Sequence, residues 1–488
     1  MERRLLFKRR LATITRVLGM LLLVEAGFMI VSLLISLIYN DNNYLSLLIS
    51  SSITAVFGII FLIPLLRYKK LKIDRRLGLL IVSSIWIVMS IFGSLPYILG
   101  GHIESFSDAF FETMSGFTTT SATIIPDVES LPQSILFWRG LTNWIGGVGI
   151  VVIVLSFIPF IGGGGMSLFS AEVAGPSKNK LSPRTKETAL IIIKIYIALT
   201  IIAMLSYWAA GMNFFDSLAH SLSTISSGGF STKNDSVSQF SPLIQYVIIV
   251  FMIISGISFP LIYFAIKGQF QKLWDNEEFK VYLAIVLIGS LVIGLLIYDP
   301  NINLETNFRH SLFQVSSILS SAGFISYDYT LWVTPATFLL FLLMFSGAMA
   351  SSTTGGLKLV RVIILFKNAN NILQRSIHSN AHIPIKFEKK ILDQQVVNNI
   401  LTIFLLYLFT FLIASLLLIA LGLGFYEAMG GVVSCLSTMG AGFGEIGAYG
   451  NYADLSQAAK LIFATLMYVG RLELITVFCL FMPAFWKN

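Results

Sequence analysis

Long apolar stretches alternate with short polar segments along almost the whole of this chain. A helix needs about 20 mostly apolar residues to cross the hydrocarbon core of a membrane. We therefore predict an all-α polytopic membrane protein with ten transmembrane helices, an even number that places both termini on one side. The candidate spans are 14–38, 48–67, 78–100, 134–160, 186–209, 241–267, 279–298, 333–366, 392–421 and 457–485.

The composition indicates that lipid is the solvent for much of the surface. The 488 residues are 56% hydrophobic and 12% charged, with a mean hydropathy of +0.81, whereas a soluble domain carries about 25% charged residues. The net charge of +8 does not indicate nucleic acid, because the basic residues gather in a few short loops between apolar segments. The apolar run beginning near Thr13 is too long for the core of a signal peptide, so we expect a retained first span.

Lysine and arginine are concentrated in every second connection between the candidate spans. The intervening connections, including 39–47, 101–133 and 422–456, carry none apart from Lys233 and Arg309 in two of them. Cytoplasmic loops hold the excess of basic residues, so we expect both termini in the cytoplasm and the chain in the cell membrane. The basic segments contain Arg3, Arg4, Lys8, Arg9, Arg10, Arg67, Lys69, Lys70, Lys72, Arg75, Arg76, Lys178, Lys180, Arg184, Lys186, Lys267, Lys272, Lys280, Lys367, Arg375, Lys386, Lys389 and Lys390.

Four hydroxyl-rich segments recur in register between the apolar stretches. Each begins nine residues after a phenylalanine, and a charged or polar side chain lies two residues after that phenylalanine. The intervening residues allow only about two to three helical turns, too few to cross a membrane. We therefore predict four re-entrant pore helices in fourfold pseudo-symmetric span–pore–span units. The segments are Ser115–Ala122, Ser223–Phe230, Ser317–Phe324 and Ser434–Ala441, and the phenylalanines are Phe106, Phe214, Phe308 and Phe425.

The repeats divide the chain into five parts. Irregular backbone at membrane depth survives only where it lines water or protein, so four re-entrant loops imply a shared polar axis. The first two spans stand outside this plan. We expect a two-span N-terminal unit at 1–72 and pore units at 73–162, 163–270, 271–372 and 373–488.

The loops have the composition expected of a cation filter. Rings of backbone carbonyls can replace the water shell of a dehydrated cation, and glycine lets carbonyls turn inward because it tolerates positive φ. For a single loop, close helix packing through small residues is the simpler reading, and we adopt it for Gly146–Gly149. Four loops in one register disfavour it. The predicted selectivity filter comprises Thr119, Thr120, Ser121, Ser227, Gly228, Gly229, Ser321, Ala322, Gly323, Thr438, Met439 and Gly440.

A second irregular stretch, 346–356, interrupts the eighth candidate span. Its glycines and hydroxyls disfavour an unbroken helix, and we predict a flexible barrier below the loops, with a kinked helix as the alternative. Arg471 lies deep in the last candidate span and is predicted to tune ion occupancy, with a local ion pair to Glu473 as the alternative. The predicted gating residues are Gly347, Ser351, Ser352, Gly355, Gly356 and Arg471.

Four other charges have structural and functional readings. Arg139, near the outer end of its span, either snorkels or binds an acidic neighbour. Asp108, Asp216 and Glu427 begin the short helices, where we expect N-terminal capping and compensation of the helix dipole. Attraction of cations to an outer vestibule is a secondary reading of these three carboxylates.

Enzymes and pumps are disfavoured. Cys435 and Cys479 fall in apolar surroundings, which favours buried packing over a disulfide or a metal site. No cluster of His, Asp and Glu at depth indicates a membrane enzyme, and no G-x-x-x-x-G-K-[ST] segment indicates an ATPase. A coupled secondary transporter of a small solute stays an alternative, although such folds usually show inverted or twofold repeats.

Three stretches carry a resemblance to a known family. Phe110–Thr120, Trp138–Gly149 and Ser223–Thr232 resemble the bacterial TrkH type of the Trk/Ktr/HKT superfamily of potassium and sodium transporters, as does the extra N-terminal two-span unit. The resemblance implies a homodimer with one pore per protomer, K⁺ or Na⁺ as the transported ion without a covalent cofactor, and a separate cytosolic nucleotide-binding subunit of the RCK/TrkA type. It also implies that the filter glycines, the 346–356 stretch and Arg471 control conduction.

One position departs from the resemblance. Ser121 stands where bacterial TrkH-type proteins usually have glycine, and serine at the matching position of plant HKT transporters goes with sodium preference. A Cβ and a hydroxyl there would reshape one ring of carbonyls. We therefore expect a potassium uptake subunit that also passes sodium, with a sodium-preferring transporter of the same fold as the alternative.

Overall fold

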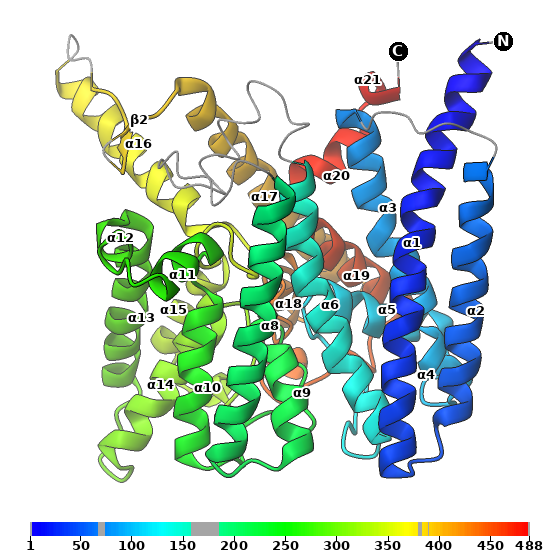
Figure 1. Cartoon of the computed structure of the whole chain (residues 1–488). Coiled ribbons are helices and arrows are strands. Elements are labelled where there is room, and N and C mark those ends of the chain that lie inside the picture. The colour runs from blue at the N-terminus through cyan, green and yellow to red at the C-terminus, as the bar shows by residue number, and fades with distance from the viewer. Residues whose placement is uncertain (1, 67–73, 158–184, 379–382, 389, 487–488) are drawn as a thin grey trace.

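The computed structural model describes residues 2–66, 74–157, 185–378, 383–388 and 390–486. These residues form a bundle of helices, most of which run along one common direction (Figure 1). Both ends of the chain lie at the same end of this bundle (Figure 1). Most of the basic residues predicted for two cytoplasmic loops, at 67–72 and 178–184, lie outside the described residues.

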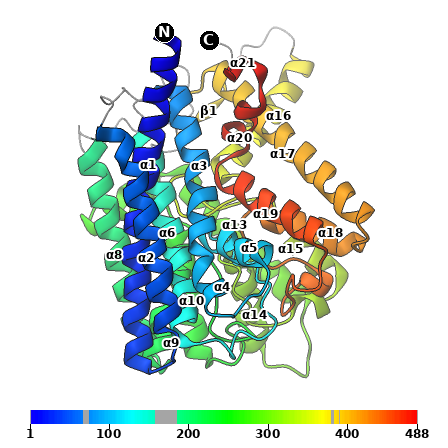
Figure 2. The same ribbon diagram turned by 90° about the vertical axis from the view of Figure 1, so that its right-hand side faces the viewer.

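The N-terminal pair α1 (Glu2–Tyr39) and α2 (Tyr44–Leu62) lies along one side of the bundle (Figures 1 and 2). Gly19 and Gly58 allow the two backbones to approach, since a Cβ on Gly19 would lie 2.6 Å from the carbonyl oxygen of Gly58. The hydroxyls of Ser50 and Thr54 bond to carbonyls of their own helix and so satisfy polar groups inside an apolar pair. The short η1 (Ile63–Leu66) follows.

The rest of the chain repeats one plan: a long helix, a short helix, an irregular loop and a second long or broken helix. The first repeat holds α3 (Arg75–Gly93), α4 (Leu95–Leu99), α5 (Phe106–Phe117) and α6 (Gln133–Phe157). The second holds α8 (Thr185–Ala209), α9 (Phe214–Ile225), α10 (Pro242–Ser255), α11 (Phe259–Ile266) and α12 (Gln271–Asp275).

The third repeat holds α13 (Glu277–Leu296), α14 (Leu304–Leu319), η3 (Tyr329–Leu331), α15 (Thr334–Met344) and α16 (Leu359–Ile377). An antiparallel hairpin of β1 (Lys386–Phe387) and β2 (Lys390–Ile391) follows. The fourth repeat holds α17 (Gln394–Ala420), α18 (Phe425–Leu436), η4 (Gly444–Ile446), α19 (Gln457–Arg471), α20 (Leu474–Phe481) and α21 (Pro483–Trp486).

The four short helices α5, α9, α14 and α18 lie in the half of the molecule away from the termini (Figure 1). Three of them begin at the phenylalanine of the repeat, Phe106, Phe214 and Phe425. The fourth, α14, begins one turn earlier, at Leu304, because Asn303 caps it there by accepting from the amide of Glu305. All four are too short to cross a membrane.

Three of the candidate spans are broken. α15 and α16 are separated by the irregular residues 345–358, as the glycines and hydroxyls there predict. α10 and α11 meet at 108°, and α19 and α20 at 112°, where the sequence analysis predicts no interruption. Within the described residues, six helices are long and apolar enough to cross a membrane, or up to eight if each bent pair is one span. The count of ten spans stays a prediction.

Polarity is arranged as in a protein dissolved in lipid. Large apolar side chains such as Leu295 on α13 and Leu416 on α17 are exposed on the outside. Small hydroxyl side chains such as Ser223, Thr224 and Ser316 on the short helices are fully or almost fully buried at the centre. The polar centre therefore belongs to the short helices and the loops that follow them.

Candidate ion pathway

The four hydroxyl-rich segments fold into loops with the same hydrogen bonds. Counted from the first serine of each segment, the amide of the fifth residue donates to the carbonyl of the second, over 2.9, 3.1, 3.0 and 3.2 Å in chain order. The amide of the sixth residue donates to the carbonyl of the first, over 2.9, 2.8, 2.8 and 2.8 Å. The donors are Thr119 and Thr120, Ser227 and Gly228, Ser321 and Ala322, and Thr438 and Met439.

The fifth residue of each loop has a left-handed backbone. Its φ is 57° at Thr119, 57° at Ser227, 53° at Ser321 and 53° at Thr438. Residues with side chains rarely adopt this conformation, and a β-branched threonine does so at a cost. The same costly conformation at four equivalent positions marks these loops as a segment whose backbone shape is required.

The seventh residue of each loop lies against the next loop. At three of these joints a glycine faces a carbonyl oxygen so closely that any Cβ would overlap it. At the fourth, the hydroxyl of Ser121 accepts a 2.8 Å hydrogen bond from the amide of Gly229. The loops therefore close a ring in chain order, with the first joined to the second and the fourth to the first. The glycine joints are Gly229 with Ala322, Gly323 with Met439 and Gly440 with Thr120.

Each loop directly follows the C-terminal end of a short helix. The helix C-caps are Thr118, Ser226, Ser320 and Ser437, each one residue before the left-handed position. The carbonyl end of a helix carries a partial negative charge. Four such ends meeting at one ring create a site that favours a cation.

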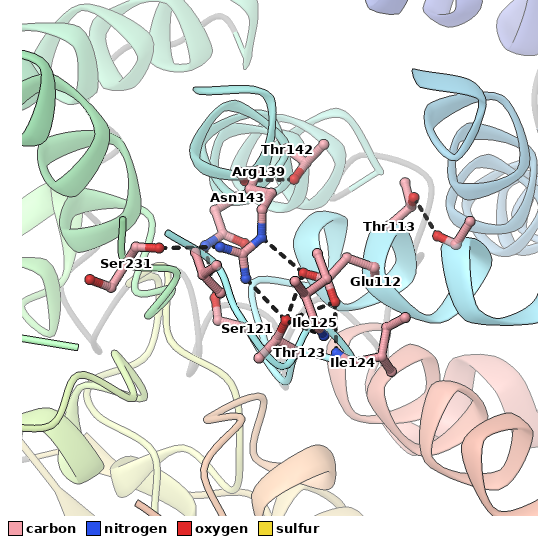
Figure 3. Close-up of polar contacts among 12 residues, drawn as sticks. Glu112, Thr113, Ser121, Thr123, Ile124, Ile125, Arg139, Thr142, Asn143 and Ser231 are labelled. Carbon is pink, nitrogen blue, oxygen red and sulfur yellow. Dashed lines mark hydrogen bonds and ion pairs between the residues drawn. The ribbon is translucent and has the colours of Figure 1, made fainter. Parts of the chain in front are cut away.

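A buried ion pair between α5 and α6 lies beside the first loop (Figure 3). Arg139 on α6 donates from Nε to Glu112 on α5 over 2.9 Å, and both side chains are buried. The remaining guanidinium nitrogens reach the carbonyl of Ser231 and the hydroxyl of Thr123, each over 3.2 Å. Of the two readings of Arg139, the acidic neighbour is the one present. Glu112 is not among the predicted site residues, although a carboxylate in a short intramembrane helix is a usable signal in the sequence.

The 346–356 stretch packs against the ring. Thr353 places its hydroxyl 2.5 Å from that of Ser227, and a Cβ on Gly355 would overlap the hydroxyl of Thr438. Gly347 donates over 2.8 Å to the carbonyl of Leu357, which closes the stretch into a loop. This loop therefore contacts the second and the fourth of the hydroxyl-rich loops.

The other predicted gating residues shape this intramembrane loop. Ser351 and Gly356 have φ values of 62° and 72°, and the hydroxyls of Ser352 and Thr354 lie 2.8 Å apart. The carbonyl of Ser351 accepts from the amide of Phe259 over 3.2 Å. Met349 donates over 3.2 Å to Gly256, so the loop occupies the break between α10 and α11.

Arg471 ends α19 and is buried against the intramembrane loop. It donates to the carbonyl of Thr353 over 2.7 Å and to that of Gly146 over 3.1 Å. Glu473 instead forms a 2.8 Å ion pair with Arg361 of α16. The local Arg471–Glu473 pair that was the alternative reading is therefore not the contact found, and Arg471 joins the loop to α6.

Two further charged residues, Glu278 and Lys358, hold the loop, and the sequence alone assigns a role to neither. Glu278 on α13 is buried, and one of its oxygens accepts from the amides of Ala350 over 2.9 Å and Val360 over 3.1 Å. Lys358 donates to the carbonyl and the hydroxyl of Thr354. A single carboxylate oxygen thus ties the middle of the loop, at Ala350, to the first turn of α16, at Val360. Because Glu278 lies in the first turn of α13, next to Glu277, the sequence alone does not distinguish it from an ordinary surface charge.

The acidic residues at the starts of the short helices lie in the first turn, where they compensate the helix dipole, but they are not the caps. Asn213 caps α9 by accepting from the amide of Asp216 over 2.7 Å. Asp216 accepts from the hydroxyl of Thr232, and Asp108 forms a 3.0 Å ion pair with Lys460 of α19. The prediction of capping is therefore wrong: Asp108 and Asp216 bind tertiary partners, and α18, which holds Glu427 in its first turn, has Gly424 as its N-cap with no side-chain cap bond.

The cysteines are packing residues. Cys435 is fully buried on α18, with its sulfur 3.9 Å from the hydroxyl of Tyr452, and Cys479 is partly buried; both are free. Within the described part of the chain, no group of three or more His, Cys, Asp or Glu side chains is placed to hold a metal ion. The ring of loops is the chemical feature that the fold builds.

The fold defines a mostly helical membrane-type protein in which four repeats of a long helix, a short helix and a loop meet at one ring. Residues 53–488 match the family described as TrkH, cation transport protein, and the chain belongs to this family. It is a multi-pass membrane protein, and the family is one of ion transporters, not enzymes.

Several relatives match over nearly the whole chain. The chain is 37% identical over 481 residues to the Trk system potassium uptake protein TrkH of Salmonella typhimurium, which covers 97% of this chain and 99% of that protein. It is 33% identical over 423 residues to the Trk system potassium uptake protein TrkG of Escherichia coli, covering 86% and 87%. The crystal structure of the potassium transporter TrkH from Vibrio parahaemolyticus matches with a TM-score of 0.88 at 33% identity, covering 98% and 99%.

Proposed function

We propose that this chain is the ion-conducting subunit of a potassium uptake system and passes K⁺, and also Na⁺, down the electrochemical gradient. The observation that carries the proposal is the ring of four loops, each of which has the same two backbone hydrogen bonds and a left-handed residue at the same position. Such a ring offers carbonyl oxygens to a dehydrated cation at the negative ends of four helices. The potassium uptake proteins among the relatives support K⁺ as the ion.

The twelve filter residues and the intramembrane loop take separate roles in this proposal. The ring selects the ion, and the loop held by Arg471 closes the route on the side of the termini. The alternation of basic loops in the sequence supports a cytoplasmic location for that side. A negative interior then favours cation entry by about 2.3 kcal/mol per charge per 100 mV.

The assembly is proposed on the family resemblance. We infer a homodimer with one pore per protomer, regulated by a cytosolic nucleotide-binding subunit of the RCK/TrkA type. The five-part division into 1–72, 73–162, 163–270, 271–372 and 373–488 is proposed as the repeat architecture of each protomer.

Flux into proteoliposomes tests the function. Purified protein in sealed vesicles should admit rubidium down a gradient and should not accumulate organic solutes. Solute uptake driven by an ion gradient would favour the coupled transporter, and vesicles impermeable to every alkali cation, with and without the regulatory subunit, would reject the proposal.

Ser121 carries the prediction of sodium permeability. Its side chain stands at the one joint of the ring that is not glycine. Reversal potentials in mixed K⁺ and Na⁺ should show appreciable sodium permeation, and Ser121→Gly should raise the preference for K⁺. Strong potassium selectivity that this substitution leaves unaltered would reject the role of Ser121.

A further inference from the structure

We propose that Asn143 is a positioning residue that sets ion specificity through Ser121, and that the Ser121 hydroxyl joins two filter loops instead of binding the ion. The proposal rests on the cation-conducting function proposed above. It assigns a role to a side chain on α6 that lies outside the four loops (Figure 3).

The Ser121 hydroxyl has two donors. The amide of Gly229 in the second loop donates to Oγ over 2.8 Å, and Nδ2 of Asn143 donates to the same oxygen over 2.8 Å. Asn143 is fully buried, and Ser121 is only partly exposed. The hydroxyl is therefore held between the first loop, the second loop and α6.

A hydroxyl oxygen has two lone pairs, and these two bonds occupy both. No acceptor site is left on Oγ for a passing cation. Ser121 thus acts on the ion through the shape of the ring. The two hydrogen bonds to its hydroxyl fix the backbone at this joint, and so fix the direction of the backbone carbonyls of Ser121 and its neighbours. This differs from direct coordination by the serine side chain.

The site is built to hold Asn143 in place. A Cβ on Gly228 would lie 2.5 Å from Nδ2 and 2.7 Å from Cγ of Asn143, so glycine at 228 leaves the space that the amide fills. Asn143 follows Arg139 by one helical turn, and Arg139 is fixed by Glu112. The helix that presents the amide is therefore anchored to the first pore helix behind the ring.

The joint is the only one of the four in the ring that uses a side chain, within the loops described above. The three glycine joints bring backbone against a carbonyl oxygen and leave no room to adjust. The Ser121 joint depends instead on two hydrogen bonds, so its geometry responds to residue 143. Specificity is expected to be most sensitive to substitution at this joint.

A double-mutant cycle between the two side chains tests the proposal. Ser121→Ala keeps the Cβ and removes the hydroxyl, and Asn143→Leu keeps the approximate volume and removes the donor. The ratio of K⁺ to Na⁺ permeability is measured from reversal potentials for the full-length protein and each variant. Asn143→Ala, which only removes atoms, replaces Asn143→Leu if the latter does not give monodisperse protein.

We expect each single variant to change the permeability ratio in the same direction by about three- to tenfold. The double variant should show no more change than the larger single one, because both remove the same joint. Opposite directions, or changes that multiply, would overturn the proposal in favour of a hydroxyl that binds the ion. A change in total flux with an unaltered ratio would assign Asn143 a purely structural role. If the unaltered protein conducts no alkali cation, the proposed function fails first.

Discussion

At the scale of single residues, the candidate pathway depends on buried polar groups that have specific partners. Glu112 illustrates this: it holds Arg139 at 2.9 Å and accepts from the amide of Ile124 over 2.9 Å, all away from water. Removing one member of a buried pair leaves an uncompensated charge, which costs more than the pair itself contributes. The guanidinium also lies 4.1 Å from the centre of the Phe230 ring, so the second loop is affected as well.

Glu112→Gln is expected to destabilise the protein strongly. Glutamine keeps an acceptor for Ile124 but leaves Arg139 unpaired, at a cost of about 3–5 kcal/mol. The matched control is Glu129→Gln, which breaks the 3.3 Å pair between Lys233 and an exposed carboxylate and should cost at most about 1 kcal/mol. Thermal unfolding in detergent measures both, and equal melting temperatures for the two variants would count against this account of the pair.

The positions of the four loops could be predicted from the sequence, because glycines and hydroxyl residues recur at matching positions in the four segments. The left-handed positions Thr119, Ser227, Ser321 and Thr438 fall at the same place in each predicted loop. The partners of Ser121 could not be predicted. Asn143 is 22 residues away and Gly229 is 108 residues away, and only the closed ring brings them together.

At the scale of elements, the unpredicted breaks in the long helices are explained by the intramembrane loop. Hydropathy does not predict the break at 256–258, because the residues on both sides of it are apolar. At this break the carbonyl of Gly256 accepts from the amide of Met349, and the amide of Phe259 donates to the carbonyl of Ser351. The break after α19 turns Glu473, with φ of 59°, towards Arg361. The first break frees backbone groups that bond to the intramembrane loop, and the second places a carboxylate against α16, which follows that loop. The hydropathy of one helix does not contain these tertiary contacts.

Glu278→Ala is expected to increase ion flux. The substitution removes the oxygen that ties the middle of the intramembrane loop, at Ala350, to the first turn of α16, at Val360. Two bonds to a charged acceptor are lost, so the equilibrium between closed and open loops should shift by at least about tenfold.

Rubidium flux without the regulatory subunit measures this shift. Glu278→Gln keeps the acceptor and should stay near the original rate. Glu277→Ala, next to it but paired with Lys367 of α16, is the control for a lost surface charge. Deletion of Ala348–Thr353 should give the largest flux, and a folded Glu278→Ala protein with unchanged or lower flux would exclude the proposed role of Glu278 in holding the loop closed.

At the scale of the whole molecule, the four repeats form one closed structure around a polar centre, with apolar side chains outside. The proposed ion selectivity, the proposed gating and the proposed role of Asn143 all depend on the closure of this ring. The ring closes because repeats that are far apart in the chain each place one residue against the next loop, and at Gly229, Gly323 and Gly440 that residue is a glycine. A substitution at any one of these joints should therefore disturb the same property.

Rubidium flux into proteoliposomes, measured for alanine at each of the three ring glycines, tests this most directly. A Cβ at each position would overlap a carbonyl oxygen of the neighbouring loop, whereas one at Gly27 on α1 meets nothing within 4 Å and provides the matched control. We predict that Gly27→Ala conducts like the unaltered protein and that Gly229→Ala, Gly323→Ala and Gly440→Ala each lose at least about tenfold in flux or lose their discrimination among cations. Correctly folded ring variants that keep both the flux and the ion preference of the original would contradict a pathway through the ring.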